Sequence, residues 1–278
     1  MKKMLIVAVA LTSLNSIKAQ LKEGTIFYER KQNMHRNLPN EQMKAFMPEF
    51  RTSEHMLLFK SNTSLYKKSP VDELPQATPV GNGGGPIVMR MSGGPGDDII
   101  YKDFNTEEKI TGKNFLNNEF LILDSVKKRN WKLTDETKKI LGYTCRKATT
   151  TILQSGGRMM IATFSTNNSS DTTKKSSGSE IKAKEVEVVA WFCEQIIVPS
   201  GPEDYSNLPG AILEIDIDNG GTTFTAIEIK KKLEKGEFVI PTKGKKVTQK
   251  EFEAESKILL EEMQKGGGMG GMFKIGGN

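Results

Sequence analysis

Short segments in which hydrophobic and polar residues alternate recur through most of the chain. In residues 24–31 (GTIFYERK), Ile26 and Tyr28 fall on one face of an extended strand, and residues 212–218 alternate aliphatic with acidic side chains. A period of two residues is typical of β-strands. We therefore expect strands at residues 24–31, as a pair within 54–68, and at 98–104, 107–115, 119–127, 144–153, 158–165, 184–195, 212–218 and 222–230.

Hydrophobic residues at helical spacing are confined to two segments. Residues 40–50 carry Met43, Phe46, Met47 and Phe50 at the spacing of one helix face, although Pro48 must end or kink that helix. In the second segment Thr248 and Glu251 form the pattern of a capping box, which predicts a C-terminal helix over 248–264. We expect that helix to dock on the sheet through Phe252, Leu259 and Met263, and we expect a helical or turn segment over 134–141.

Many short strands with two or three short helices predict a mainly β protein built on a large, curved antiparallel sheet. The expected architecture is an incomplete β-barrel similar to that of the periplasmic lipoprotein carriers, with one helix near each end covering its concave face. We expect a single β-rich domain over residues 20–265, in which the segments 69–97 and 166–182 are mobile loops rich in Gly, Pro, Ser and Asn. The Gly- and Met-rich residues 266–278 are expected to be a disordered tail.

The first nineteen residues have the composition of a secretory signal peptide. Lys2 and Lys3 precede an apolar run from Met4 to Leu11, and Ala19 is a small residue suited to cleavage before Gln20. No later segment approaches the 18 apolar residues of a membrane-spanning helix. The sequence therefore predicts an exported protein without a transmembrane segment in its mature chain, located in the periplasm or at the cell surface.

The most distinctive stretch of the sequence runs from Val188 to Lys230. It predicts a buried strand containing Trp191, then a rigid loop, then a β-hairpin that turns at Asn219-Gly220-Gly221. Proline fixes φ and glycine permits positive φ, so a loop dense in both should hold one shape. The loop residues that we single out are Pro199, Gly201, Pro202, Tyr205, Leu208, Pro209 and Gly210.

This order of residues resembles the GLPGLI family of Bacteroidetes cell-envelope proteins. The signature stands here as residues 207–213 (NLPGAIL), with Asn and Ala replacing a Gly and a Leu of the family pattern, and residues 140–148 resemble a second family landmark. Members are often encoded beside outer-membrane receptors for nutrient uptake. The resemblance therefore implies an accessory role in the cell envelope, without a known biochemical activity.

The chain has two cysteines, Cys145 and Cys193. An oxidising compartment favours a disulfide between them, but the strand order decides whether they can meet. In a simple meander the thiols would lie at opposite ends of the sheet. If residues 144–165 instead form one long arm that returns as residues 183–195, the thiols would lie across neighbouring strands. Two free buried thiols are the alternative.

Charge and composition exclude some functions. Removing the three lysines of the signal peptide lowers the net charge from +6 to +3, and the basic runs lack interleaved aromatic residues, so we do not expect nucleic-acid binding. The carboxylates Glu214, Asp216 and Asp218 lack the spacing of a calcium loop, and we expect them to form a solvated face. We expect no cofactor.

Candidate catalytic residues are few, because the chain has only His35 and His55. We therefore expect a non-enzymatic envelope protein that binds an apolar, lipid-like ligand or a partner protein. The first alternative is a hydrolase that uses His55 with an unrecognised nucleophile, and a Ser or Cys within reach of His55 would favour it. The second is a Cu(I)-binding protein, based on the methionine pairs Met89/Met91, Met159/Met160 and Met269/Met272.

Overall fold

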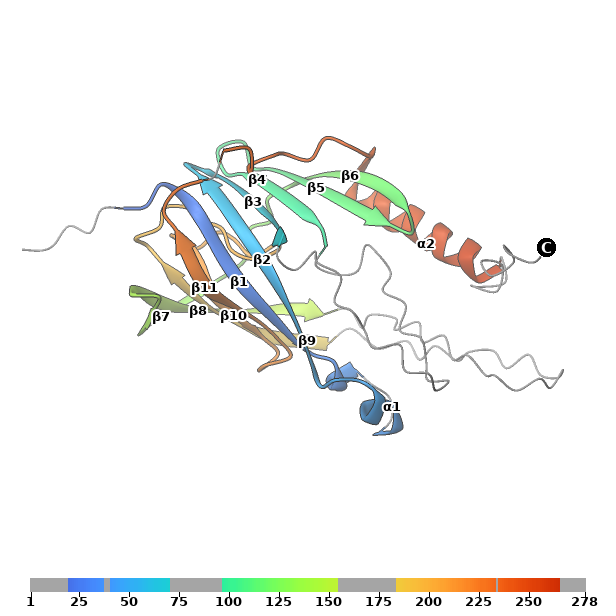
Figure 1. The fold of residues 1–278 in the computed structure, drawn as a ribbon, viewed down its shortest axis with the longest axis horizontal. Helices are drawn as coiled ribbons and strands as arrows, with labels where there is room; N and C mark the ends of the chain where they lie inside the picture. The colour runs from blue at the N-terminus through green and yellow to red at the C-terminus, as the bar shows by residue number, and fades with distance from the viewer. Residues whose placement is uncertain (1–19, 38–40, 71–96, 155–183, 234, 266–278) are drawn as a thin grey trace, which may run out of the picture.

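The computed structural model describes residues 20–37, 41–70, 97–154, 184–233 and 235–265 (Figure 1). These residues form one twelve-stranded sheet in the order β12-β6-β5-β4-β3-β2-β1-β11-β10-β9-β8-β7. The strands are β1 (Glu23–Asn33), β2 (Phe50–Lys60), β3 (Thr63–Lys68), β4 (Ile99–Asp103), β5 (Glu108–Phe115), β6 (Asn118–Ser125), β7 (Lys132–Ile140), β8 (Tyr143–Gln154), β9 (Lys184–Cys193), β10 (Ala211–Ile217), β11 (Thr222–Lys230) and β12 (Lys245–Thr248). The helices are α1 (Glu41–Phe46), α2 (Gln249–Lys265) and the 3-10 turn η1 (His35–Asn37).

The mainly β prediction is confirmed, but the sheet is an open one rather than a barrel. Its two outer strands are β12 and β7, which lie at opposite ends of the strand order. Figure 1 shows β3–β6 in the upper part of a curved sheet and β7–β10 in the lower part, joined through β2, β1 and β11. Strand β1 pairs with β2 on one side and with β11 on the other, so it joins the two halves of the chain.

Alternation along the strands gives the sheet two hydrophobic faces. On the inner face, the register places Ile26, Leu57, Tyr66 and Ile100 side by side across four strands, and all four side chains are buried in the largest core cluster. The intervening residues point to the outer face. There a second cluster contains Met56, Leu58, Leu65 and Tyr101, against which Leu233 and Phe238 pack.

The prediction of a helical or turn segment at residues 134–141 was wrong, because residues 132–140 form strand β7. Most of its side chains are exposed, since β7 is an edge strand that pairs only with β8. An edge strand in water needs no alternating hydrophobic pattern, so its sequence (KLTDETKKI) carried little strand signal. The predicted strand at 158–165, the loops 69–97 and 166–182, the signal peptide and the tail lie wholly or largely outside the described residues.

The number of helices was also overpredicted. Among the described residues only α2 exceeds two turns, and α1 has six residues that end before Pro48. The capping box of α2 is present: the Thr248 backbone N–H donates to Glu251 Oε2 at 2.7 Å, and the Glu251 N–H donates to Thr248 Oγ1 at 3.3 Å. Phe252 anchors the helix at the β6–β12 edge, with its ring edge-on to Phe120 at a centroid distance of 5.2 Å. No described helix is long and apolar enough to cross a membrane.

The connection from β9 to β10, residues 194–210, leaves the strands and crosses the inner face of the sheet. We call it the crossing loop. Its side chains Ile196, Val198, Tyr205 and Leu208 are buried in the same cluster as the inner-face residues of β1–β4. The loop therefore forms part of the core rather than a surface excursion, and it returns to the sheet at Gly210.

Gly210 is the position at which the return of this loop is most constrained. Its φ is +147°, and a Cβ built there would lie 2.1 Å from the backbone oxygen of Cys193. Gly142 also has a positive φ, +81°, but a Cβ there would meet nothing within 4 Å. Substitution of these two glycines therefore separates the free-energy cost of a positive φ, present at both, from the cost of a collision with the backbone, present only at Gly210.

We predict that Gly210→Val destabilises the protein by more than about 3 kcal/mol, because the backbone of β9 must move to admit the side chain. The matched control, Gly142→Val, should cost about 1–2 kcal/mol for its positive φ alone. Urea unfolding followed by far-UV circular dichroism measures both values. Equal losses for the two variants would contradict this account of the loop.

Candidate functional site

Backbone hydrogen bonds within the crossing loop fold it into a compact turn. The Gly201 N–H donates to the Tyr205 carbonyl at 2.9 Å, and the Asn207 N–H donates to the Pro199 carbonyl at 2.9 Å. Glu203 and Asn207 adopt left-handed backbone conformations, with φ of 48° and 70°. The turn therefore projects Glu203 and the adjacent Asp204 from its tip toward the sheet.

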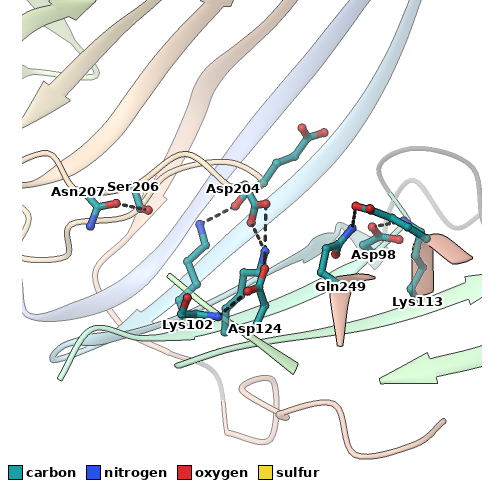
Figure 2. Close-up of polar contacts among 12 residues, drawn as sticks. Asp98, Lys102, Lys113, Asp124, Asp204, Ser206, Asn207 and Gln249 are labelled. Atoms are coloured by element: carbon teal, nitrogen blue, oxygen red, sulfur yellow. Dashed lines mark hydrogen bonds and ion pairs between the residues drawn. The ribbon is translucent and has the colours of Figure 1, made fainter. Parts of the chain in front are cut away.

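Charged side chains of the sheet meet the tip of the loop in a partly buried group that we call the anchoring cluster (Figure 2). The Lys102 ammonium donates to the Glu203 carbonyl oxygen at 2.6 Å. The Lys109 ammonium lies 3.2 Å from Asp204 and 3.4 Å from Asp124. Arg30 Nε lies 3.6 Å from the Glu203 carboxylate. The anchoring cluster comprises Arg30, Lys102, Lys109, Asp124, Glu203 and Asp204.

The register of the sheet explains why these charges gather. Lys102 on β4 pairs with Lys109 on β5, and Lys109 pairs with Asp124 on β6, so the three side chains share the inner face. Lys102 and Lys109 are only 2% and 5% exposed. A buried ammonium is costly unless it is hydrogen-bonded or paired. The carbonyl and carboxylate oxygens of the crossing loop supply those partners.

Burial lowers the pKa of Lys102. The pKa of Lys102 is lowered to about 8, and desolvation by burial is the largest cause. The nearby cations Lys109 and Arg129 contribute to the lowering, whereas Asp204 and Glu203 oppose it. The Lys102 ammonium is thus held in a site that favours its neutral form more than water does. Such perturbed groups mark either a functional site or an internal ion-pair network.

The two loop carboxylates respond in opposite directions. Desolvation raises the pKa of Glu203, and the neighbouring Asp204 carboxylate adds to that rise against Arg30. Desolvation also raises the pKa of Asp204, but Lys102 and Lys109 together outweigh it, so the pKa of that carboxyl lies below its usual value. Asp204 therefore remains the anion that compensates the buried lysines.

Aromatic residues complete the attachment of the loop. The Trp131 indole N–H donates to the Ser206 carbonyl at 2.9 Å, and the Arg129 guanidinium lies 4.7 Å from the centroid of the Tyr205 ring. On the β3 side, the Ser64 and Ser200 hydroxyls are 2.9 Å apart. Residues from β1, β3, β4, β5 and the β6–β7 connection thus hold one loop.

The sequence-predicted loop residues occupy distinct environments. Pro202, Tyr205, Leu208 and Gly210 are buried, whereas Pro209 is exposed. Gly201 packs so closely on Ile212 that a Cβ there would lie 2.7 Å from the Ile212 Cβ. Trp191 lies elsewhere, on β9, where Lys138 covers its ring at 4.4 Å. The loop residues therefore gather under and within the crossing loop, while Trp191 belongs to another part of the sheet.

The charged residues of the sheet that bind this loop could not be identified from local sequence patterns. Arg30, Lys102 and Lys109 carry no sequence motif that singles them out, yet each is buried on the inner face. A signal was present in β4, where Lys102 stands two residues after Ile100 and so shares its face. Its partner lies 101 residues away at Glu203, a separation that a local pattern does not reveal.

We predict that the pH dependence of stability identifies Lys102. The pKa of Lys102 is 10.5 when unperturbed and about 8 in the folded protein. Between pH 8 and pH 10.5 the unfolded chain therefore binds more protons at this residue than the folded chain does. The contribution of Lys102 to the free energy of unfolding consequently rises with pH in this range. The free energy of unfolding of the wild type, relative to Lys102→Met, should therefore increase from pH 7 to pH 10 by up to about 3 kcal/mol. Parallel stability curves for the two proteins, measured by urea unfolding, would contradict the assignment.

His55 lies beside the anchoring cluster, on the same inner face. Its ring stacks on Tyr66 with a centroid distance of 5.3 Å, and its Nε2 is 3.0 Å from the Ser53 hydroxyl. Ser53 pairs with Arg30 in the register of β1 and β2. The criterion set for the hydrolase alternative, a serine within reach of His55, is therefore met. The His55 side chain itself is only 2% exposed.

Both cysteines are buried, and they carry free thiols in this structure. Residue 146 pairs with residue 192 across β8 and β9, so Cys145 and Cys193 are the next residues along the two strands and lie opposite each other. Of the two topologies considered, the one with a long arm is therefore correct within the described residues, because β8 pairs directly with β9. The disulfide remains a prediction.

The other candidate residues from the sequence, the three carboxylates of residues 214–218 and the methionine pairs, do not form a site in the described structure. Glu214 pairs with Lys138 at 2.6 Å, Asp218 pairs with Arg36 at 3.2 Å, and Asp216 accepts the Gly220 N–H at 2.5 Å, so these carboxylates are individually bonded. The expected solvated face is in fact partly buried. No group of three or more His, Cys, Asp and Glu side chains with metal-site geometry occurs in the described part of the chain. The methionine pairs of the copper hypothesis lie outside it.

A known family matches part of the chain. The profile of a family described as "Protein of unknown function (Porph_ging)" matches residues 131–214, less than a third of the chain. The matched region starts at Trp131, whose indole binds the crossing loop, and it contains the whole of that loop. It also contains both cysteines. No curated protein matches the sequence.

Comparison with solved structures shows a shared fold. A structure of PNGF-II in space group C2 matches with a TM-score of 0.51 at 15% identity, covering 86% of this chain and 33% of that one. A structure of PNGF-II in space group P21 matches with a TM-score of 0.50 at 14% identity, covering 86% and 34%. The chain thus spans about a third of the length of PNGF-II. At this identity the likeness concerns the fold alone.

Proposed function

We propose that this chain is a non-enzymatic, exported envelope protein that binds a partner protein. The observation that carries the proposal is the crossing loop. The inner face of the curved sheet is where an incomplete barrel would hold an apolar ligand, and here Tyr205, Leu208 and their neighbours pack against it. This packing favours a protein partner, bound beyond the part of the inner face that the loop fills, over a lipid-like ligand held within the curve of the sheet.

The surface that best fits a partner lies between α2 and strands β6 and β12, at one end of the sheet. A groove of about 340 Å³ opens there, with Phe120, Ile258 and Leu259 among its lining residues. Ile258 is 54% exposed. Glu119, Glu255 and Glu262 also line the groove, and of these Glu255 pairs with Lys245. An apolar floor with an acidic rim suits a segment that presents an apolar side chain beside a lysine or arginine.

Export and family membership are part of the same proposal. They are supported by the composition of residues 1–19 and by the resemblance of residues 207–213 to the GLPGLI signature. The matched family of unknown function over residues 131–214 is compatible with that resemblance. The resemblance also motivates the accessory role beside outer-membrane receptors, in which a partner protein is the natural ligand.

We predict that the tagged full-length chain captures a partner in stoichiometric amount from the envelope fraction of cells that produce it. Capture should fall at least about tenfold for Ile258→Asp, because a carboxylate would be desolvated in the acidic groove. The matched control is Ile227→Asp, which alters another exposed isoleucine, 44% exposed, on β11. Quantitative mass spectrometry of proteins and lipids measures the result, and thermal unfolding confirms that both variants fold.

The outcomes separate the parts of the proposal. Equal capture by the wild type and both variants would place the binding surface elsewhere. Recovery of a lipid without a protein would favour the apolar-ligand alternative. Absence of any captured component would contradict the binding function itself.

A second candidate function rests on the contact between Ser53 and His55. Ser53 Oγ lies 3.0 Å from His55 Nε2, as a serine nucleophile and its general base would, and Arg30 stands across from Ser53 on β1. The candidate is the less favoured because His55 is buried and stacked on Tyr66. Hydrolysis of p-nitrophenyl acetate tests it: turnover that is lost in Ser53→Ala would support a hydrolase, and equal rates would exclude this pair.

A further inference from the structure

The two cysteines occupy directly opposed positions at one end of the β8–β9 ladder. The ladder runs from the pair Gln154 and Lys184 to the pair Arg146 and Phe192. The next residues on each strand are Cys145 and Cys193, and their thiols lie close enough for each to shift the pKa of the other. Directly opposed residues of antiparallel strands have Cα atoms about 4.5–5.5 Å apart, which lies within the roughly 4.4–6.8 Å range of disulfides.

This cysteine pair also lies at the base of the crossing loop. Cys193 is the last residue of β9, and its carbonyl oxygen accepts the N–H of Ile196 at 3.3 Å as the loop begins. Cys193 also pairs with Ala211, the first residue of β10, where the loop ends. A covalent bond from Cys193 to Cys145 would therefore fix both ends of the loop to β8.

The thiols are sealed from solvent. Cys145 and Cys193 are both 0% exposed. The Cys145 sulfur lies 3.8 Å from the Tyr143 carbonyl oxygen, and the Cys193 sulfur lies 4.0 Å from Gln195 Oε1. An oxidant must contact a thiolate directly to react with it. Neither sulfur atom can be reached in the folded protein without local opening of β8, β9 or the loop.

We propose that Cys145 and Cys193 form a disulfide during folding, before the crossing loop covers the two sulfur atoms. Once the protein has folded, the core prevents both oxidation of the free thiols and reduction of the disulfide. A low-molecular-weight disulfide is the oxidant. The thiolate of one cysteine attacks a sulfur atom of that disulfide and releases one thiolate, giving a mixed disulfide. The thiolate of the second cysteine then attacks the protein sulfur atom and releases the other. Two protein thiols lose two protons and two electrons, and the oxidant becomes two thiols.

The experiment uses the full chain, unfolded in urea with dithiothreitol and then refolded in two ways. One sample is refolded in reductant, transferred to reductant-free buffer and exposed to oxidised glutathione only after folding. The other is refolded in the presence of oxidised glutathione. Each is quenched by alkylation with iodoacetamide in denaturant, and intact mass counts the alkylated thiols. The single-cysteine variant Cys193→Ser calibrates the mass of one alkylated thiol.

We expect no alkylated thiols in the chain refolded with oxidised glutathione. In the chain oxidised after folding, disulfide formation should be at least about 100-fold slower than in the chain that refolds from urea with oxidised glutathione, because it requires opening of the core. Two alkylated thiols after oxidative refolding would refute the bridge. Oxidation of the folded dithiol protein at the rate of the refolding chain would refute the sealing. Both readouts use the wild type, so they do not depend on whether Cys193→Ser folds.

Discussion

The burial of three cationic side chains on the inner face of the sheet is the constraint on which the rest of the structure depends. Arg30, Lys102 and Lys109 leave water when the sheet curves, and each ion so buried costs several kcal/mol unless oxygen atoms replace its hydration. The crossing loop provides those atoms through the Glu203 carbonyl and the Asp204 carboxylate. The charges therefore require the loop, and the loop in turn fills the face on which they lie.

This mutual dependence shapes what the molecule can do. The loop comes from the β9–β10 half of the sheet and is bound by β1, β3, β4 and β5 of the other half. It thus connects the two halves across the curve and occupies the space between them with buried side chains. The partner surface that we propose beside α2 lies beyond the part of the inner face that the loop fills. A cross-strand bridge at Cys193 would reinforce the loop at its base.

Sequence patterns predicted the local elements well and the site poorly, for physical reasons. Alternation located β1 and the β10–β11 hairpin, and the Thr248–Glu251 pair located the start of α2. Strand β7 was missed because an exposed edge strand needs no hydrophobic face. The anchoring cluster was missed because a lysine on a strand normally indicates solvent, and only the register of β4 and β5 reveals that Lys102 and Lys109 point inward. The position of the two cysteines depended on topology, which local patterns leave open.

Native-state hydrogen exchange tests the central claim, that the crossing loop belongs to the core, most directly. The informative amides are those of Gly201, Asn207 and Ile212, which donate to Tyr205, Pro199 and Ser200. If the anchoring cluster holds the loop, these amides exchange only through global unfolding, with the same protection and urea dependence as the amides of β1 and β2. Exchange of these three amides through a local opening, while β1 and β2 remain protected, would contradict the account.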